Sequence, residues 1–165
     1  MDFDMLQMTN SGWEITGHMT IKELEKIAYD IEIEFELLNN VQINFDENKE
    51  DKESCAILKG DIYYIRIGIK DYNDLEKITN EQCNHICNSI LHELIHARNF
   101  FSLQNEEREK IINNKMTLAH YGWKVLDEYS AYKEANQVYP ETADELNGNV
   151  DDVFKAFEHM GKGIL

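Results

Sequence analysis

The sequence predicts an α+β domain, in which one helix precedes a small, mostly antiparallel sheet and several helices follow it. Two observations carry this prediction. Strict alternation of apolar and polar residues, the pattern of half-buried strands, occurs between residues 41 and 69. Apolar residues at helical spacing occupy the segments on both sides. The 165 residues include one proline and no Gly- or Ser-rich linker, so residues 1–165 are predicted to form a single domain.

The first helix is predicted at residues 21–38. Thr20 and Glu23 have the spacing of a capping box, in which each side chain binds a backbone N–H at the helix start. An asparagine pair, Asn39 and Asn40, is suited to end this helix because asparagine tolerates the left-handed conformation. The helix has one apolar face, made by Ile21, Leu24, Ile27, Ala28, Ile31 and Phe35.

Three strands are predicted after this helix, at residues 41–45, 54–58 and 62–69. The second and third are joined by a hairpin-like turn at Gly60. In the third strand, period-two alternation places Tyr63, Ile65 and Ile67 on one face and Tyr64 on the other. The acidic run at residues 46–53 is expected to be a solvated loop.

The rest of the chain is predicted to be helical. Thr79 and Gln82 form a second capping-box pattern, which opens a long helix ending near Phe101. Two further helices are expected at residues 105–113 and 117–138, where Pro140 stops the pattern. Short helices are expected near residues 142–145 and 149–152.

The charge balance excludes several classes of partner. Lys and Arg number 16 against 32 Asp and Glu, a net charge of −16. Binding to nucleic acid or to anionic lipid requires clustered basic residues, so neither is expected. A protein or peptide partner with a basic contact site suits this charge. With no signal-peptide pattern and no long apolar run, the chain is expected to be cytoplasmic and not to associate with membranes.

The three cysteines predict packing rather than disulfide bonds. An odd number of cysteines cannot form a disulfide framework. Cys83 and Cys87 are one helical turn apart, so both are expected to face the core as small apolar side chains, whereas Cys55 lies in a strand.

The long helix carries a motif with the spacing of a metal site, His92-Glu93-Leu94-Ile95-His96. His92 and His96 project from the same helical face and can reach one ion. Glu93 is rotated by about 100° from His92 and lies beside that face, where it can act on a metal-bound water. The apolar neighbours of the motif make burial of two bare imidazoles costly, which favours a bound metal over core histidines bonded to carboxylates.

A catalytic zinc ion needs a third protein ligand and one open position. The ligand is expected from the later helix, where the candidates are Asp127, Glu128 and Glu134. Glu128 is preferred because Ala131, one turn later, leaves room on its face and because Glu reaches further than Asp. Close approach of this helix to the motif helix is favoured by the small residues Ser130, Ala131 and Ala135. An apolar stripe is expected at Val125, Leu126, Tyr129 and Tyr132.

The HExxH motif followed by Glu128-Tyr129-Ser130-Ala131 resembles the gluzincin arrangement and, among compact zincins, the ImmA/IrrE-like metallopeptidases. The resemblance covers about residues 60–138. It implies a zincin-like fold with His92, His96 and Glu128 as zinc ligands and Glu93 as the catalytic base. It also implies that an edge strand near the motif helix aligns an extended peptide.

The expected function is therefore zinc-dependent hydrolysis of a peptide bond in a protein or peptide. The developing oxyanion needs a hydrogen-bond donor, and the candidates are His120, Tyr121, Tyr129 and Tyr132. The strand at residues 63–69 is a candidate for pairing with substrate, and His85 is a candidate partner for the ligands. The alternative function is a catalytically inactive interaction protein on the same scaffold, which binds a basic partner through its acidic surface. Iron, cobalt and manganese also accept these ligands.

Overall fold

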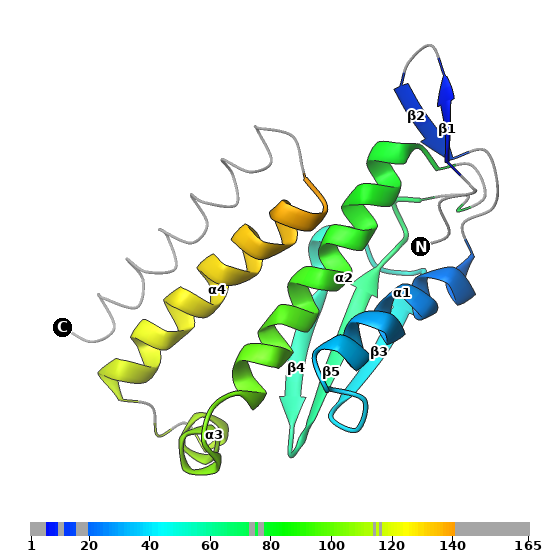
Figure 1. Ribbon diagram of the computed structural model, residues 1–165. Coiled ribbons are helices and arrows are strands. Elements are labelled where there is room, and N and C mark those ends of the chain that lie inside the picture. The colour runs from blue at the N-terminus through cyan, green and yellow to red at the C-terminus, as the bar shows by residue number, and fades with distance from the viewer. Residues whose placement is uncertain are drawn as a thin grey trace.

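The computed structural model in Figure 1 describes residues 20–72, 75, 78–113, 115 and 117–140, and the backbone of residues 6–9 and 12–15. The helices predicted near residues 142–145 and 149–152 lie outside the described residues. The described chain is α+β, with helix α1, a three-stranded sheet and then helices α2, α3 and α4. An antiparallel hairpin that the sequence analysis did not predict, β1 (Leu6–Thr9) with β2 (Gly12–Ile15), precedes α1.

Helix α1 (Ile21–Glu34) begins at the predicted capping box but ends earlier than predicted. The Thr20 N–H donates to Glu23 Oε2 at 2.7 Å, and the Glu23 N–H donates to Thr20 Oγ1 at 3.2 Å. The predicted end at residue 38 is wrong, because Glu36 takes the left-handed conformation (φ 58°) in place of an asparagine. The Leu37 N–H then bonds to the Glu32 carbonyl at 2.8 Å, which closes a Schellman-type turn and buries Leu37.

The sheet is mixed, with the strand order β3-β5-β4. Its strands are β3 (Val41–Asp46), β4 (Cys55–Lys59) and β5 (Ile62–Gly68). The turn at Gly60 (φ 63°) makes β4 and β5 antiparallel as predicted, but β3 pairs with β5 in parallel. The prediction of a mostly antiparallel sheet is therefore wrong. Alternation identifies strands and their faces, but it does not determine which strands become neighbours.

Helices α1 and α2 lie over the same face of the sheet (Figure 1), and the main core lies between these helices and the sheet. Tyr63, Ile65 and Ile67 belong to this layer, as their predicted shared face requires, whereas Tyr64 is exposed on the other face. The acidic segment before β4 is only partly solvated. It contains a short 3-10 helix, η2 (Asp51–Glu53), and Asp51 turns inward toward α2.

Helix α2 (Asn80–Phe101) is the centre of the molecule and packs against α1, the sheet and α4. It begins at its predicted capping box, where the Gln82 N–H donates to Thr79 Oγ1 at 3.1 Å. Cys83 and Cys87 are both buried in the core as predicted. Among the helices in the described ranges, none has the length and apolarity needed to cross a bilayer.

After α3 (Asn105–Ile112), helix α4 (Leu118–Val138) runs beside α2 (Figure 1). Ala131 and Ala135 are fully buried in a cluster with Leu91 and Ile95 of α2, so the prediction of close approach through small residues is confirmed. The predicted apolar stripe is wrong in part, because Leu126 is 68% exposed. Alanines allow the closest approach of the two backbones, and this contact sets the rotation of α4 about its axis.

Candidate metal centre

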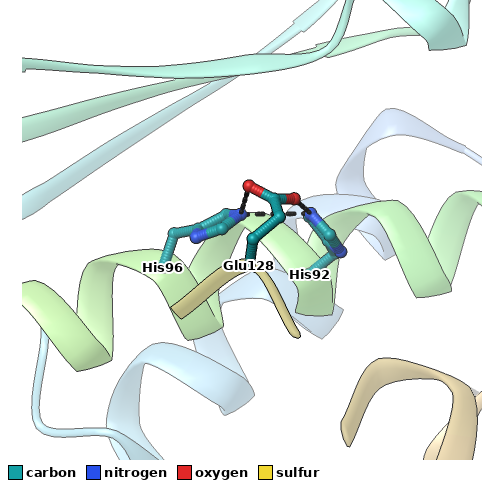
Figure 2. A group of neighbouring side chains, drawn as sticks. All are labelled: His92, His96 and Glu128. Carbon is teal, nitrogen blue, oxygen red and sulfur yellow. Dashed lines mark hydrogen bonds and ion pairs between the residues drawn. The ribbon is translucent and has the colours of Figure 1, made fainter. Parts of the chain in front are cut away.

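The two motif histidines face α4 from consecutive turns of α2, and Glu128 of α4 lies opposite them (Figure 2). The two Nε2 atoms of His92 and His96 are 3.1 Å apart. The Glu128 carboxylate spans both rings, with Oε1 3.3 Å from His92 Nε2 and Oε2 3.5 Å from His96 Nε2. One donor atom from each residue falls in a group no more than 4.8 Å across. These three residues therefore form a candidate metal-binding triad.

The donor atoms have the spacing that a tetrahedral ion requires. Bonds of about 2.0–2.1 Å to an ion at tetrahedral angles place neighbouring ligand atoms about 3.3–3.4 Å apart. The separations of 3.1, 3.3 and 3.5 Å lie close to this value. Two imidazole nitrogens and a carboxylate are also a donor set that zinc accepts. Both imidazole side chains are largely buried, at 13% and 12% exposure, so an ion would compensate for the hydration that their nitrogens lose.

A chain of hydrogen bonds fixes the orientation of His96. Its Nδ1 bonds to Asp127 Oδ2 at 2.8 Å, which leaves Nε2 directed at Glu128. Asn99 Nδ2 donates to the other oxygen of Asp127 at 2.8 Å and to Ser130 Oγ at 2.9 Å. A carboxylate on the outer nitrogen of a ligating histidine sets its tautomer and raises its basicity. Asp127 thus supports His96.

The charges in this group perturb one another strongly. Burial lowers the pKa of His96, but hydrogen bonds to Asp127 and Glu128 outweigh burial and raise that pKa to about 10. Burial raises the pKa of Glu128, yet its contacts with His92 and His96 hold that pKa well below its ordinary range. The group therefore favours an ionised carboxylate beside a positive charge. A divalent cation would supply that charge in place of the His96 proton.

Glu93 lies beside the triad and lines the same cleft. Burial raises the pKa of Glu93, and the neighbouring His92 and His96 act in the opposite direction. A carboxyl group with a raised pKa, next to a site for an ion and lining a cleft, is a candidate to accept and return a proton.

The two other acidic candidates for the third ligand have different partners. Asp127 bonds to the outer nitrogen of His96 and does not face His92. Glu134 lies farther along α4, where Arg98 Nη2 donates to its Oε2 at 2.6 Å. Of the three carboxylates proposed from the sequence, Glu128 is the one placed between the two Nε2 atoms.

Of the four residues proposed as oxyanion donors, Tyr132 is the one that lines the cleft. Its ring lies 4.5 Å from that of His92 between centroids. Tyr129 is not among the residues that line the cleft, and its ring is 50% exposed beside Lys133. His120 is not among them either. That residue lies in the first turn of α4, where its Nδ1 accepts from the Thr117 N–H and its Nε2 pairs with Glu107 of α3. Tyr121 is likewise absent from the lining of the cleft.

Three features around the site were not predicted from the sequence. Tyr63 of β5 lines the cleft, although only its strand was considered. Asn99 holds Asp127, and nothing in its local pattern marks it. Asp51, from the segment predicted to be a solvated loop, bonds to His85 Nε2 at 2.6 Å and to Ser89 Oγ at 2.9 Å. His85, Ser89 and His92 have the spacing of one face of α2, and this spacing could have indicated that another segment contacts that face.

The triad opens into a cleft of about 520 Å³ between β4, α2 and α4. Towards α3, the cleft is lined by the apolar residues Leu58, Phe100, Ile111, Trp123 and Val125. A second cavity of about 460 Å³ shares His92, Glu93 and Tyr132 with the cleft. Its other wall carries Asp51, Lys52, Asp71 and His85, near the first half of α2. The candidate site therefore has an apolar side and a charged side, on which two carboxylates lie beside one lysine and one histidine.

No known protein family matches the sequence, and no curated protein or solved structure is significantly similar to it. The geometry of the site itself therefore carries the functional conclusion.

Proposed function

We propose that the protein is a zinc-dependent peptidase with a zincin-like arrangement of its site. The observation that carries this proposal is the grouping of His92, His96 and Glu128 within 4.8 Å, with Glu93 beside them at a cleft. Three protein ligands that leave a fourth position open towards a cleft are typical of catalytic zinc, whereas structural zinc is enclosed by four. A purely structural ion would also have no use for a buried base at residue 93.

The bound ion would lower the pKa of a water molecule and polarise the peptide carbonyl. Glu93 then accepts a proton from the water. At the same time the water oxygen forms a bond to the carbonyl carbon, and the carbonyl electron pair moves to the carbonyl oxygen. When that pair returns, the C–N bond breaks and Glu93 delivers the proton to the leaving amine. The raised pKa of Glu93 suits both transfers, because the group can hold the proton between them.

An extended peptide would pair with β4 rather than with the predicted strand at residues 63–69. That stretch contains β5, the central strand, which has β3 on one side and β4 on the other. Strand β4 has one partner within the described sheet, and its residues Cys55, Ala56 and Leu58 line the cleft. Backbone pairing at a strand edge binds a peptide largely independently of its sequence. Side chains of the substrate would then enter the apolar cleft and the charged cavity beside it.

The proposed substrate carries a basic side chain near the scissile bond. The cavity that continues from Glu93 presents the carboxylates of Asp51 and Asp71 beside one lysine, Lys52, and the whole chain has a net charge of −16, so the overall charge favours a basic substrate. Asp51 already bonds to His85 and Ser89, so it is held in place before substrate arrives. A fixed carboxylate at a partly enclosed site attracts a cation more strongly than a mobile surface carboxylate does.

The test is Glu93→Gln in the zinc-loaded protein, assayed on a peptide library by mass spectrometry. The variant keeps the shape of the side chain and removes the base. We expect it to bind one zinc ion as the wild type does and to lose activity by about 10²-fold or more. The control is Glu134→Gln, which removes a carboxylate of α4 that pairs with Arg98, and which should keep full activity.

Three results would contradict the proposal. A zinc-loaded wild type that cleaves no peptide, but binds a basic protein through this face, would favour the interaction protein. Equal cleavage by wild type and Glu93→Gln would exclude Glu93 as the base. Unfolding on removal of zinc, without any activity, would instead indicate a structural ion.

A further inference from the structure

The proposed reaction needs a hydrogen-bond donor for the oxygen of the substrate carbonyl, and the wall of the cleft opposite α4 contains one. Tyr63 is the second residue of β5, where it pairs with Val41 of β3 and Leu58 of β4. Its side chain projects from the sheet face covered by α2 and lines the cleft together with His92, Glu93, His96 and Glu128. It therefore reaches the triad from the sheet, whereas Tyr132 reaches it from α4.

The ring of Tyr63 is held firmly in this position. Its centroid lies 5.6 Å from that of Phe100 and 6.1 Å from that of Phe101, both in edge-on contacts. Its backbone N–H donates to the Asn40 carbonyl at 2.8 Å. A donor fixed in the central strand needs little reorganisation when charge develops on a bound substrate, which is the condition for effective oxyanion stabilisation.

The hydroxyl of Tyr63 is open to the cleft and close to its charges. Within the described residues, no side chain or carbonyl group accepts its proton, and the hydroxyl is not sealed from solvent. Burial, together with the carboxylates of Asp127, Glu93 and Glu128, raises the pKa of Tyr63 above its ordinary value. The hydroxyl is thus a protonated donor in the same cleft as the triad.

We propose that Tyr63 is a catalytic residue that donates a hydrogen bond from its hydroxyl to the carbonyl oxygen of the substrate and to the oxyanion that forms there. This inference rests on the proposed peptidase function. As water adds, the carbonyl electron pair moves to oxygen, and Tyr63 stabilises that charge while keeping its own proton. When the C–N bond breaks, the pair returns to the carbonyl and the hydrogen bond weakens.

The test compares Tyr63→Phe with Tyr64→Phe in the zinc-loaded protein. The first variant removes the hydroxyl but keeps the ring against Phe100 and Phe101. The matched control removes the same atom from the next residue, whose side chain lies on the opposite face of β5 beside Lys59. Both variants are assayed for zinc content, thermal unfolding and steady-state cleavage of one peptide taken from the library that the wild type cleaves.

We expect Tyr63→Phe to lower kcat by about 10²-fold with little change in KM, zinc content or melting temperature, because the hydrogen bond strengthens only as charge develops. Tyr64→Phe should match the wild type. A phosphinic peptide of the same sequence, which mimics the tetrahedral state, should bind Tyr63→Phe about 10²-fold more weakly.

Wild-type kcat in Tyr63→Phe, or equal losses in both tyrosine variants, would overturn this inference and leave the peptidase intact. A loss confined to KM would also overturn it, since it would show uniform binding of substrate. If the zinc-loaded wild type cleaves nothing, the proposed function fails, and this inference fails with it.

Discussion

At the scale of single residues, the candidate site depends on side chains that orient the ligands as well as on the ligands themselves. His96 can present Nε2 to an ion because Asp127 occupies its Nδ1, and Asp127 is in turn held by Asn99. Such outer partners fix both the ring and its tautomer. The direct donors and this supporting chain form one unit that bridges α2 and α4.

Replacing Asp127 with Asn should weaken zinc binding by about 10- to 100-fold, because the amide is a poorer acceptor and fixes the tautomer less well. Competition with a chromogenic chelator measures this change. Glu134→Gln, a similar substitution on the same helix away from the histidines, should leave the affinity unchanged. Equal affinities for wild type and Asp127→Asn would show that this bond does not organise the site.

The sequence predicted local relations at the site better than distant ones. The grouping of His92 and His96 follows from helical spacing alone, because residues four apart on a helix project from the same face, and Glu93 lies next to that face. Glu128 could be ranked above Asp127 and Glu134 only by size and by its neighbour Ala131. Tyr63 and Asn99 could not be found, because the place of Tyr63 depends on how α2 packs on the sheet and the role of Asn99 on how α2 packs against α4.

At the scale of elements, helix ends and helix contacts position the site. Helix α4 presents Glu128 and Tyr132 to α2 because Ala131 and Ala135 form the closest contact. Capping-box residues correctly predicted the starts of α1 and α2. The end of α1 was missed, since the left-handed residue is a glutamate that no propensity rule would select.

Substitution of Glu36 directly tests how helix α1 ends. A left-handed conformation strains any residue with a Cβ atom, so Glu36→Gly should stabilise the zinc-loaded protein by about 0.5–1 kcal/mol. Glu34→Gly, inside the last turn of α1, should instead destabilise it by about 1 kcal/mol. Urea denaturation curves measure both values. If Glu36→Gly instead lowered the free energy of unfolding, the Glu36 side chain would stabilise the fold by more than its left-handed backbone destabilises it.

Strand direction is a second feature that could not be predicted. The segments that form β3, β4 and β5 were located to within a residue or two, and the buried face of β5 was assigned correctly. The parallel pairing of β3 with β5 was not, because nothing in alternating residues distinguishes the possible neighbours of a strand. This pairing makes β4 an edge strand, so it decides where a peptide could bind.

At the scale of the whole molecule, the acidic charge should affect which substrates the site accepts. The net charge is −16, and Asp51 and Asp71 line the cavity beside Glu93. For peptides with a basic residue near the cleaved bond, KM should rise several-fold between about 10 mM and 150 mM salt, because screening shortens from about 30 Å to about 8 Å. For neutral peptides, KM should barely change. A KM for basic peptides that is insensitive to salt would contradict the basic preference.

The most direct test of the central claim is the position of the ion. Crystals of the zinc-loaded protein, measured on both sides of the zinc absorption edge, would locate it by anomalous scattering. The account predicts one ion bound by the Nε2 atoms of His92 and His96 and by the Glu128 carboxylate, with a remaining position open to the cleft. An ion bound elsewhere, or a Glu128 side chain turned away from a metal held by the two histidines, would contradict it.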